Sequence, residues 1–272
     1  MKITEKNDYT EVSGFGEMNL SLTLDCGQAF RWKEENGLWR GTAYGRSVAV
    51  ESKNGALRFY GSSPEEVQKI WVRYFDLERD YESVVKSFAL DERVRTAMER
   101  SGTVRILNQE PWEALCSFII SQCNNIPRIK GIINTLCLSF GTQLPGGSFT
   151  FPGPEKLARC EAEELDVLRA GYRAPYIIAA ARAVASGRLD LEALSKGPLD
   201  DARKGLMEIR GVGRKVADCT LLFSMGFSEV FPVDRHIKRA MDEIYPGGLP
   251  SCFDPFPGLA QQYIFISQAI AN

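Results

Sequence analysis

One short stretch of the chain combines a lysine, a glycine hairpin and a later aspartate. Gly211 and Gly213 stand just before Lys215 in the run Gly-Val-Gly-Arg-Lys, and Asp234 follows in Pro-Val-Asp. Glycines let the backbone turn tightly and aim several N–H groups outward, which suits a phosphate. A helix that begins here adds partial positive charge, which disfavours an ammonium ion and favours a neutral, nucleophilic amine on Lys215. The stretch therefore predicts a phosphate grip, an amine nucleophile and a carboxylate for acid–base or electrostatic work.

Both chemical residues also have ordinary interpretations. Lys215 can be an exposed helix residue that pairs with Asp218 at i+3. Asp234 precedes an apolar-periodic run, which is typical of a helix N-cap. The cap interpretation is compatible with chemistry, because a carboxylate held by helix N–H groups stays ionised and can stabilise positive charge on a sugar.

Four other residues have types and spacing that suit recognition of a base or a phosphate. Cys219 shares a helix face with Lys215, and Gln261 shares one with Phe265, so that an amide and a ring can read a base edge and stack on its plane. The alternatives are a core thiol at Cys219, and a solvated Gln261 beside a core Phe265. His236, the single histidine, can donate to a phosphate or be a solvated helix residue.

The numbers of histidines and cysteines argue against a metal site and against a catalytic triad. One histidine excludes histidine-rich metal sites and any Ser-His or Cys-His triad that does not use His236. The seven cysteines are scattered and contain no C-x₂-C pair, so that an iron–sulfur or zinc site is not expected. We therefore expect free thiols and no metal or cofactor.

Composition places few further limits on function. The 272 residues suffice for one large domain or two modest ones, and the apolar and charged fractions, 44% and 25%, are ordinary for a soluble protein. No apolar run can span a bilayer, and the N-terminus lacks the core of a secretion signal. A net charge of −2 argues mildly against nucleic acid, but residues 235–239 and 203–204 can supply a local basic face.

The elements that position these residues differ between the two ends of the chain. From residue 18 to 60 we expect antiparallel strands, because residues 18–24 alternate apolar and polar types and two Asn-Gly pairs, at 36–37 and 54–55, indicate hairpins. One face of this sheet is predicted to be packed by Trp32, Trp39, Val48, Val50, Leu57 and Phe59.

Beyond the predicted N-cap and first-turn pair Ser63-Pro64, nearly every segment shows helical spacing. The clear helices are predicted near 111–123, 127–140, 174–186, 198–208, 214–225, 234–244 and 257–270. The prediction is an α+β fold, in which a small antiparallel sheet domain with trailing helices (1–105) packs on a larger helical domain (106–272), with the ligand in a groove between helical lobes.

These motifs resemble the helix-hairpin-helix DNA glycosylases, in the branch of 8-oxoguanine DNA glycosylase, over nearly the whole chain. The hairpin and Pro-Val-Asp-Arg-His look like the superfamily's catalytic segment. Three groups of residues make the branch specific: Cys219, the Gly-Gln-Ala-Phe-Arg-Trp segment from Gly27, and the pair Gln261 and Phe265. The loops Asn-Asn-Ile-Pro-Arg at 124–128 and Gly-Tyr-Arg-Ala at 171–174 resemble its DNA-wedging loops.

The resemblance implies a bifunctional enzyme that flips out and excises 8-oxoguanine, and then nicks the strand by β-elimination. Lys215 would form a Schiff base with the sugar, and Asp234 would stabilise the oxocarbenium charge. The base would lie between Cys219 and Phe265, with Gln261 on its Watson–Crick edge and the Gly27 carbonyl on its N7–H. The implied DNA contacts come from Asn124, Asn125, Arg128, Tyr172, Arg173, Gly211, Gly213 and His236, with Tyr172 as the wedge and Arg128 and Arg173 on an opposite cytosine.

Two departures and two rival functions accompany the resemblance. Animal members carry three consecutive asparagines where this chain has Cys123 before Asn124, and the connection between the Asp234 helix and the last helix is short. The ending at Asn272 without targeting tails suits a compact prokaryotic version, expected as a monomer in the cytoplasm with the nucleoid. The alternatives are a glycosylase for another damaged base and a non-catalytic helix-hairpin-helix DNA-binding protein, which would not need Lys215 and Asp234 together.

Overall fold

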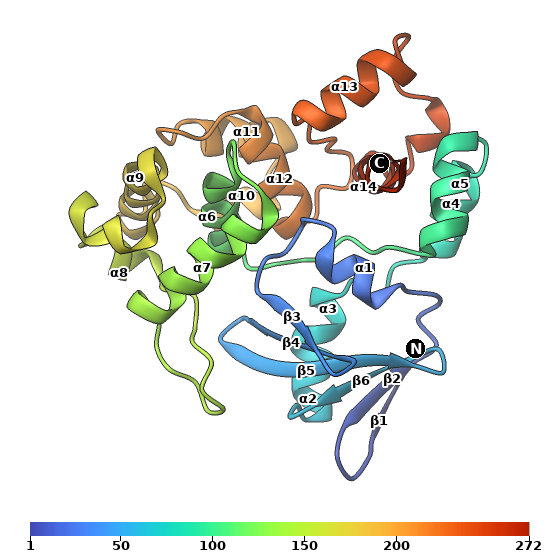
Figure 1. Cartoon of the computed structure of the whole chain (residues 1–272), viewed down its shortest axis with the longest axis horizontal. Coiled ribbons are helices and arrows are strands. Elements are labelled where there is room, and N and C mark those ends of the chain that lie inside the picture. The colour runs from blue at the N-terminus through green and yellow to red at the C-terminus, as the bar shows by residue number, and fades with distance from the viewer. Residues whose placement is uncertain (272) are drawn as a thin grey trace.

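The N-terminal part of the protein is a single antiparallel sheet. The computed structural model describes residues 1–271, with side chains up to residue 268. Six strands lie in the order β1-β2-β6-β5-β4-β3, and each pairs antiparallel with its neighbours (Figure 1). The strands are β1 (Lys2–Glu5), β2 (Thr10–Ser13), β3 (Trp32–Glu35), β4 (Leu38–Ala43), β5 (Arg46–Lys53) and β6 (Ala56–Tyr60).

Both predicted hairpins are confirmed. Asn36 and Gly37 have φ values of 55° and 79°, and Asn54 and Gly55 have 53° and 72°. Two consecutive left-handed residues are what a two-residue hairpin turn needs, because their twist matches that of the strands. The predicted sheet face is also confirmed, since its six apolar residues are buried in one cluster with the rings of Trp71, Tyr74 and Phe75.

The predicted strand at residues 18–24 is wrong, because this segment forms helix α1 (Leu20–Asp25). Asn19 caps the helix by accepting a hydrogen bond from the backbone N–H of Leu22 at 3.0 Å. Leu20, Thr23 and Leu24 are buried, and their i, i+3, i+4 spacing places them on one helical face. The apolar residues of this segment fit both the two-residue period of a strand and the 3.6-residue period of a helix. The N-cap at Asn19 and the single buried face favour the helix.

The rest of the chain is helical, as predicted. Its helices are α2 (Pro64–Glu66), the π-helical turn η1 (Val67–Trp71), α3 (Val72–Tyr74), α4 (Tyr81–Phe88), α5 (Glu92–Ser101), α6 (Pro111–Ser121), α7 (Ile126–Phe140), α8 (Pro154–Ala158), α9 (Ala174–Ala185), α10 (Leu191–Lys196), α11 (Leu199–Met207), α12 (Arg214–Ser224), α13 (Arg235–Ile244) and α14 (Pro257–Ala271). Three 3₁₀ segments connect them: η2 (Ala162–Leu168), η3 (Gly171–Arg173) and η4 (Ser251–Phe253).

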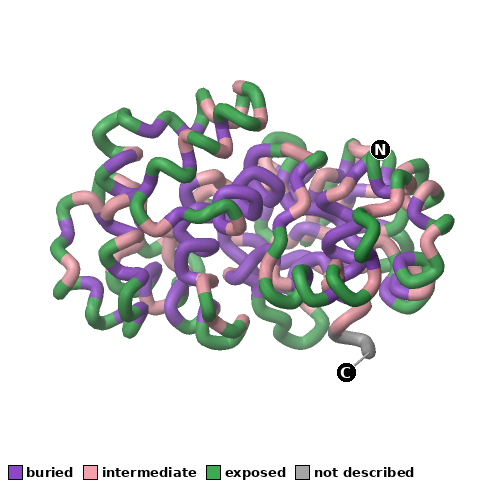
Figure 2. The backbone as a smooth tube through the Cα atoms, turned by 90° about the horizontal axis from the view of Figure 1, so that it is seen from above, coloured by how far each residue is buried: buried purple, intermediate pink, exposed green. Residues whose placement is uncertain are grey.

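The predicted helices agree with the observed bounds to within two residues, and the predicted cap at Ser63 accepts a hydrogen bond from Glu66 N. Helices α6 and α12 pack against each other in the middle of the body, and α14 packs against α5 and α13 (Figure 1). Figure 2 shows that the buried stretches of backbone gather in the interior of the molecule and that the exposed stretches lie along its outside. A second hydrophobic cluster runs through these helices and includes residues of α4 and α5. The domain boundary near residue 105 stays a prediction.

A buried ion pair joins the sheet to the helical body. Arg31, which precedes β3, donates to the Glu113 carboxylate of α6 at 3.0 Å and also to the Phe149 carbonyl. Both charged side chains are about a tenth exposed or less. The cost of desolvating them is offset only while both partners are present. Among the described helices, none is long and apolar enough to cross a membrane.

Candidate active site

A cavity of about 470 Å³ opens between α12, α14, the end of α6 and the loop before α7. It brings together nine of the predicted residues: Gly27, Asn124, Asn125, Lys215, Cys219, Asp234, His236, Gln261 and Phe265. Gly211, Gly213, Arg128, Tyr172 and Arg173 do not line it. The residues predicted for catalysis and for the base therefore all line one cavity, and their roles stay predictions.

Lys215 lies in the first turn of α12 and is half-buried. Its Nζ donates to Ser121 Oγ at 3.2 Å and lies 5.2 Å from the centre of the Phe118 ring. Ser121 donates its own hydroxyl hydrogen to the Phe118 carbonyl at 2.8 Å, so that its lone pairs are free to accept from the lysine. Ser121 and Phe118 therefore hold the Lys215 amine at the cavity wall.

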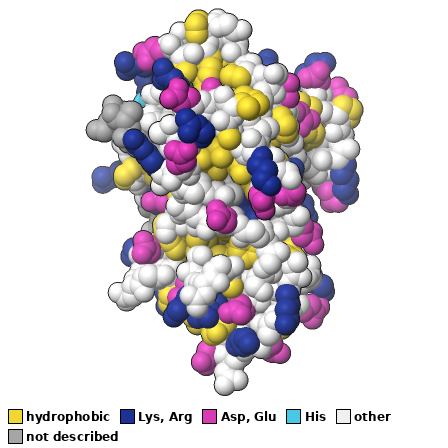
Figure 3. Space-filling model, turned by 90° about the vertical axis from the view of Figure 1, so that its right-hand side faces the viewer, with side chains coloured by type: hydrophobic (Ala, Val, Ile, Leu, Met, Phe, Trp, Pro, Cys, Tyr) yellow, Lys and Arg dark blue, Asp and Glu magenta, His cyan; other side chains and the backbone are white. Residues whose placement is uncertain are grey.

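The ordinary interpretation of Lys215 is not supported. Asp218 is buried, and it pairs with Arg203 at 2.7 Å and with Arg214 at 3.5 Å. Arg203 is therefore committed to a structural ion pair and does not supply the basic face expected at residues 203–204. Arg239 similarly pairs with Glu243 at 2.7 Å, and the face of the molecule in Figure 3 carries interspersed charges of both signs.

The two hairpin glycines serve different purposes. Gly211 has φ +89°, and a Cβ there would lie 2.2–2.6 Å from ring atoms of Tyr176, so that both conformation and space require glycine. Gly213 has φ −92° and is the N-cap of α12, with no side-chain cap and with open space at its Cβ position. The first N–H groups of α12 consequently have no side-chain partner, as an anion-binding helix terminus requires.

Asp234 is the N-cap of α13, as predicted. Its Oδ1 accepts a hydrogen bond from Ile237 N at 2.8 Å, and the residue also lines the cavity. His236 is exposed in the first turn of α13 and lines the same cavity. Asp234 is therefore both a cap and a carboxylate that a ligand can reach.

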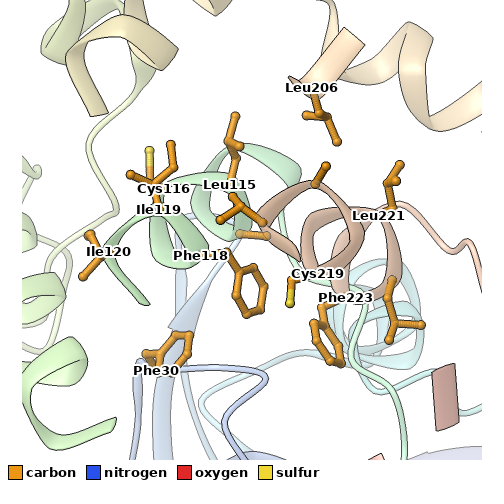
Figure 4. Packing of buried hydrophobic residues seen from close by; sticks show 14 of the residues in the cluster. Phe30, Leu115, Cys116, Phe118, Ile119, Ile120, Leu206, Cys219, Leu221 and Phe223 are labelled. Atoms are coloured by element: carbon orange, nitrogen blue, oxygen red, sulfur yellow. The ribbon is translucent and has the colours of Figure 1, made fainter. Parts of the chain in front are cut away.

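Aromatic rings that the sequence analysis did not single out surround Cys219. Phe118 stacks on Phe223 with ring centres 5.4 Å apart, and Phe30 meets Phe118 edge-on at 6.0 Å. Figure 4 shows these three rings and the Cys219 sulfur turned toward the same space. Burial raises the pKa of the Cys219 thiol, although nearby Lys215 acts in the opposite direction. The uncharged sulfur and the rings form an apolar surface suited to a flat base.

The pair Gln261 and Phe265 lies on α14 as predicted, but Gln261 is buried, which rules out the solvated alternative. Two unpredicted polar residues, Cys26 and Gln262, line the cavity beside it. Gly27 has φ +84°, and a Cβ there would lie 3.5 Å from Ile126 Cδ1. The backbone conformation is thus a structural reason for glycine at position 27.

The loop before α7 is held by its own side chains. Asn125 caps α7 by accepting from Arg128 N at 3.0 Å, and Asn124 donates to the Ile120 carbonyl at 3.2 Å. Cys123 is exposed and has φ 48°, a conformation that asparagine adopts more readily than cysteine. Arg128 is exposed, and its guanidinium donates to the Arg169 carbonyl at 3.3 Å.

Tyr172 and Arg173 are neighbours with opposite exposure. The Tyr172 ring is half exposed, which suits the predicted wedge. Arg173 is buried, and its guanidinium donates to the carbonyls of Gln122, Cys123 and Ala170. In this structure Arg173 holds the loop of Cys123 and Asn124 in place, and its contact with an opposite base stays a prediction.

Within residues 1–268, no group of three or more histidine, cysteine, aspartate or glutamate side chains could hold a metal ion. All seven cysteines are free thiols. The chemistry available to the cavity therefore comes from an amine, a carboxylate and amide groups set against aromatic rings.

The chain is similar to known proteins along its whole length. It matches the N-terminal domain model of 8-oxoguanine DNA glycosylase over residues 14–115, and the HhH-GPD superfamily base excision DNA repair protein over residues 116–248. The N-glycosylase/DNA lyase of Saccharomyces cerevisiae is 31% identical over 258 residues, which cover 84% of this chain and 69% of that relative.

Two solved structures have the same fold over essentially both full lengths. MBOgg1 in complex with a low-affinity DNA ligand is 37% identical with a TM-score of 0.93, and covers 100% of this chain and 99% of that one. The 8-oxoguanine glycosylase/lyase of Clostridium acetobutylicum, solved with double-stranded DNA that contains cytosine opposite 8-oxoG, is 34% identical with a TM-score of 0.92 and the same coverage. The chain belongs to the 8-oxoguanine DNA glycosylase family of N-glycosylase/DNA lyases, within the helix-hairpin-helix superfamily of base excision repair enzymes.

Proposed function

We propose that this enzyme binds double-stranded DNA, excises 8-oxoguanine opposite cytosine, and cuts the strand through a Schiff base on Lys215. The observation that carries the proposal is the shared cavity of Lys215, Asp234 and Gln261. A glycosylase that forms a covalent intermediate needs an amine, a carboxylate and a base-reading group within reach of one nucleotide.

The first step breaks the bond between the sugar and the base. The Lys215 amine, once it has lost a proton, attacks C1′ while the glycosidic electron pair leaves with the base, and Asp234 stabilises the positive charge that develops on the sugar. The cap bond from Ile237 N holds the Asp234 carboxylate in a fixed position for this role.

The second step uses the covalent intermediate. Loss of a proton from the amine and opening of the sugar ring give an imine between Lys215 and C1′. Removal of a proton from C2′ then expels the 3′ phosphate, which is β-elimination, and water releases Lys215 from the imine. The uncapped N-terminus of α12 is suited to hold a DNA phosphate during both steps.

Borohydride trapping on a panel of duplexes tests this function. The panel holds 8-oxoguanine opposite each of the four bases, other damaged bases, and a pre-made abasic site. We expect a borohydride-dependent covalent adduct with 8-oxoguanine opposite cytosine and with the abasic site. Adducts only with a different lesion would identify another glycosylase, and DNA binding without any adduct would indicate a non-catalytic protein.

A further inference from the structure

A chain of buried polar side chains ends at the base-reading amide. It runs from Gln28 through Cys26 and Gln262 to Gln261, and connects the segment before β3 to α14. All four residues are buried, with exposed fractions of 0%, 5%, 4% and 6% in that order. Buried amides in such a chain orient one another, because each donor needs an acceptor.

The first member of the chain is oriented by the backbone. The Oε1 of Gln28 accepts from Leu107 N at 2.9 Å, and its Nε2 donates to the carbonyls of Thr23 and Arg105, each at 2.8 Å. A flipped Gln28 amide would set oxygen against these carbonyls, so that the orientation is fixed. Both amide hydrogens of Gln28 are used by these carbonyls, and its Nε2 lies in contact with the Cys26 sulfur at 3.5 Å.

The hydrogen bonds that follow in this chain also fix the orientation of the Gln261 amide. Burial raises the pKa of Cys26 to about 12, which keeps the thiol hydrogen in place. Cys26 Sγ donates to Gln262 Oε1 at 3.2 Å, and Gln262 Nε2 donates to Gln261 Oε1 at 2.7 Å. Among the described residues, no group accepts from the Gln261 amide nitrogen, yet that nitrogen is not fully enclosed. It is therefore available to a ligand in the cavity that Gln261 lines.

We propose that Cys26 and Gln262 are positioning residues that lock the Gln261 amide, so that the site selects a flipped purine with a carbonyl group at position 6 over one with an amino group. This inference rests on the proposed function. The Gln261 nitrogen donates to a 6-carbonyl oxygen, and the second lone pair of its oxygen can accept from N1–H. A 6-amino purine presents the opposite pattern, and a freely turning amide would accommodate both.

Three substrates isolate the group at position 6. They are duplexes with 8-oxoguanine, 8-oxohypoxanthine, which keeps the 6-carbonyl but lacks the 2-amino group, and 8-oxoadenine, which has a 6-amino group. Single-turnover excision is measured for each, beside cleavage of a pre-made abasic site. We expect the wild-type enzyme to excise 8-oxohypoxanthine about 10- to 100-fold faster than 8-oxoadenine, since an unpaired buried donor costs about that factor.

The Gln262→Met variant removes both hydrogen bonds while keeping the length of the side chain. We expect the preference for 8-oxohypoxanthine over 8-oxoadenine to fall about tenfold, and abasic-site cleavage to fall much less. Gln109→Met is the matched control, because Gln109 is also buried but donates only to the carbonyls of Gln28 and Phe223 and lies outside the cavity. It should leave the preference unchanged.

If Gln262→Met does not fold, the variants Cys26→Ser and Cys26→Ala test whether this chain of hydrogen bonds orients the Gln261 amide. Serine keeps a donor to Gln262 and should keep the preference, whereas alanine should lower it several-fold. A preference that survives both Gln262→Met and Cys26→Ala overturns the inference. A wild-type enzyme that cleaves abasic sites but excises none of the three bases instead contradicts the proposed function.

Discussion

The sheet core and the cavity wall use aromatic side chains in different ways. In the sheet core, the indole N–H of Trp32 donates to Tyr74 Oη at 2.7 Å, and that of Trp71 donates to Ser62 Oγ at 3.0 Å. In the cavity, the Phe118 ring lies beside the Lys215 amine, and Phe265 is half-buried. The first region satisfies its polar groups internally, whereas the second keeps an amine, a carboxylate and an amide within reach of a ligand.

Because of this difference, we expect substitutions in the two regions to have different effects, one on stability and the other on the reaction. Substitutions in the saturated sheet core should change the free energy of unfolding and leave the chemistry of the folded enzyme intact. Substitutions of reactive groups in the cavity wall should do the reverse, because few of their bonds support the fold. Each of the following variants tests one side of this comparison.

Lys215→Gln should show the largest effect. Glutamine can keep a hydrogen bond to Ser121 but has no nucleophilic amine, so that we expect no trapped adduct and a loss of at least about 10³-fold in excision. Thermal unfolding should change little. Lys196→Gln, an exposed lysine outside the cavity, is the control and should trap normally. Full adduct formation by Lys215→Gln would assign the nucleophile to another residue.

Asp234→Asn should slow single-turnover excision by about 10²–10³-fold, since it removes charge stabilisation that operates only in the transition state. DNA binding should change far less. Asparagine is also a good N-cap, and the free energy of unfolding should fall by less than about 0.5 kcal/mol. The control is Asp190→Asn, which alters a similar cap on α10 away from the cavity. Equal rates for Asp234→Asn and wild type would reduce Asp234 to a cap.

Trp71→Phe tests the sheet core. It removes the hydrogen bond to Ser62 and leaves space in a fully buried site, which should lower the free energy of unfolding by about 1–3 kcal/mol. Denaturant unfolding measures this cost. Trapping per folded molecule, measured well below the transition temperature, should match wild type. A large loss of trapping there would show that the sheet core also shapes the cavity.

The hairpin glycines sharpen the comparison within one motif. Gly211→Ala must adopt a positive φ and displace the Tyr176 ring, and should cost about 1–3 kcal/mol of stability. Gly213→Ala has open space and an ordinary φ, and should cost less stability, about 0.5–1 kcal/mol, because alanine is a poorer N-cap than glycine. Its methyl group at the uncapped helix terminus should instead weaken binding to an abasic duplex several-fold. The reverse pattern would place the phosphate contact elsewhere.

Cys123→Asn should show the smallest effect on stability, within about 0.5 kcal/mol, because asparagine tolerates the positive φ of this position. The added amide can bond to a base edge, and we expect a several-fold stronger preference for cytosine opposite 8-oxoguanine. Excision rates opposite the four bases provide the measurement. A wild-type enzyme already strictly selective for cytosine, and unaffected by the substitution, contradicts the expectation.

Local sequence predicted the elements whose cause is local. The Asn-Gly turns, the caps at Ser63 and Asp234, and the bounds of the long helices follow from a few neighbouring residues each. The hairpin with its lysine is also contiguous, and a resemblance to a known family could be recognised on it. These features together determined the fold class and the candidates for nucleophile and carboxylate.

Tertiary structure decided what depends on burial and on segments distant in sequence. The alternation of apolar and polar residues at 18–24 does not show which of these side chains the rest of the protein covers. In the structure the segment buries Leu20, Thr23 and Leu24 and forms helix α1. Neighbouring carbonyls enclose the Arg173 guanidinium, which the local sequence does not indicate, and its DNA contact stays a prediction. The rings of Phe30, Phe118 and Phe223 meet from three separate segments, and Cys26 reaches Gln262 across 236 residues of chain. Such contacts depend on how whole elements pack, and periodicity along one element carries no information about its partner.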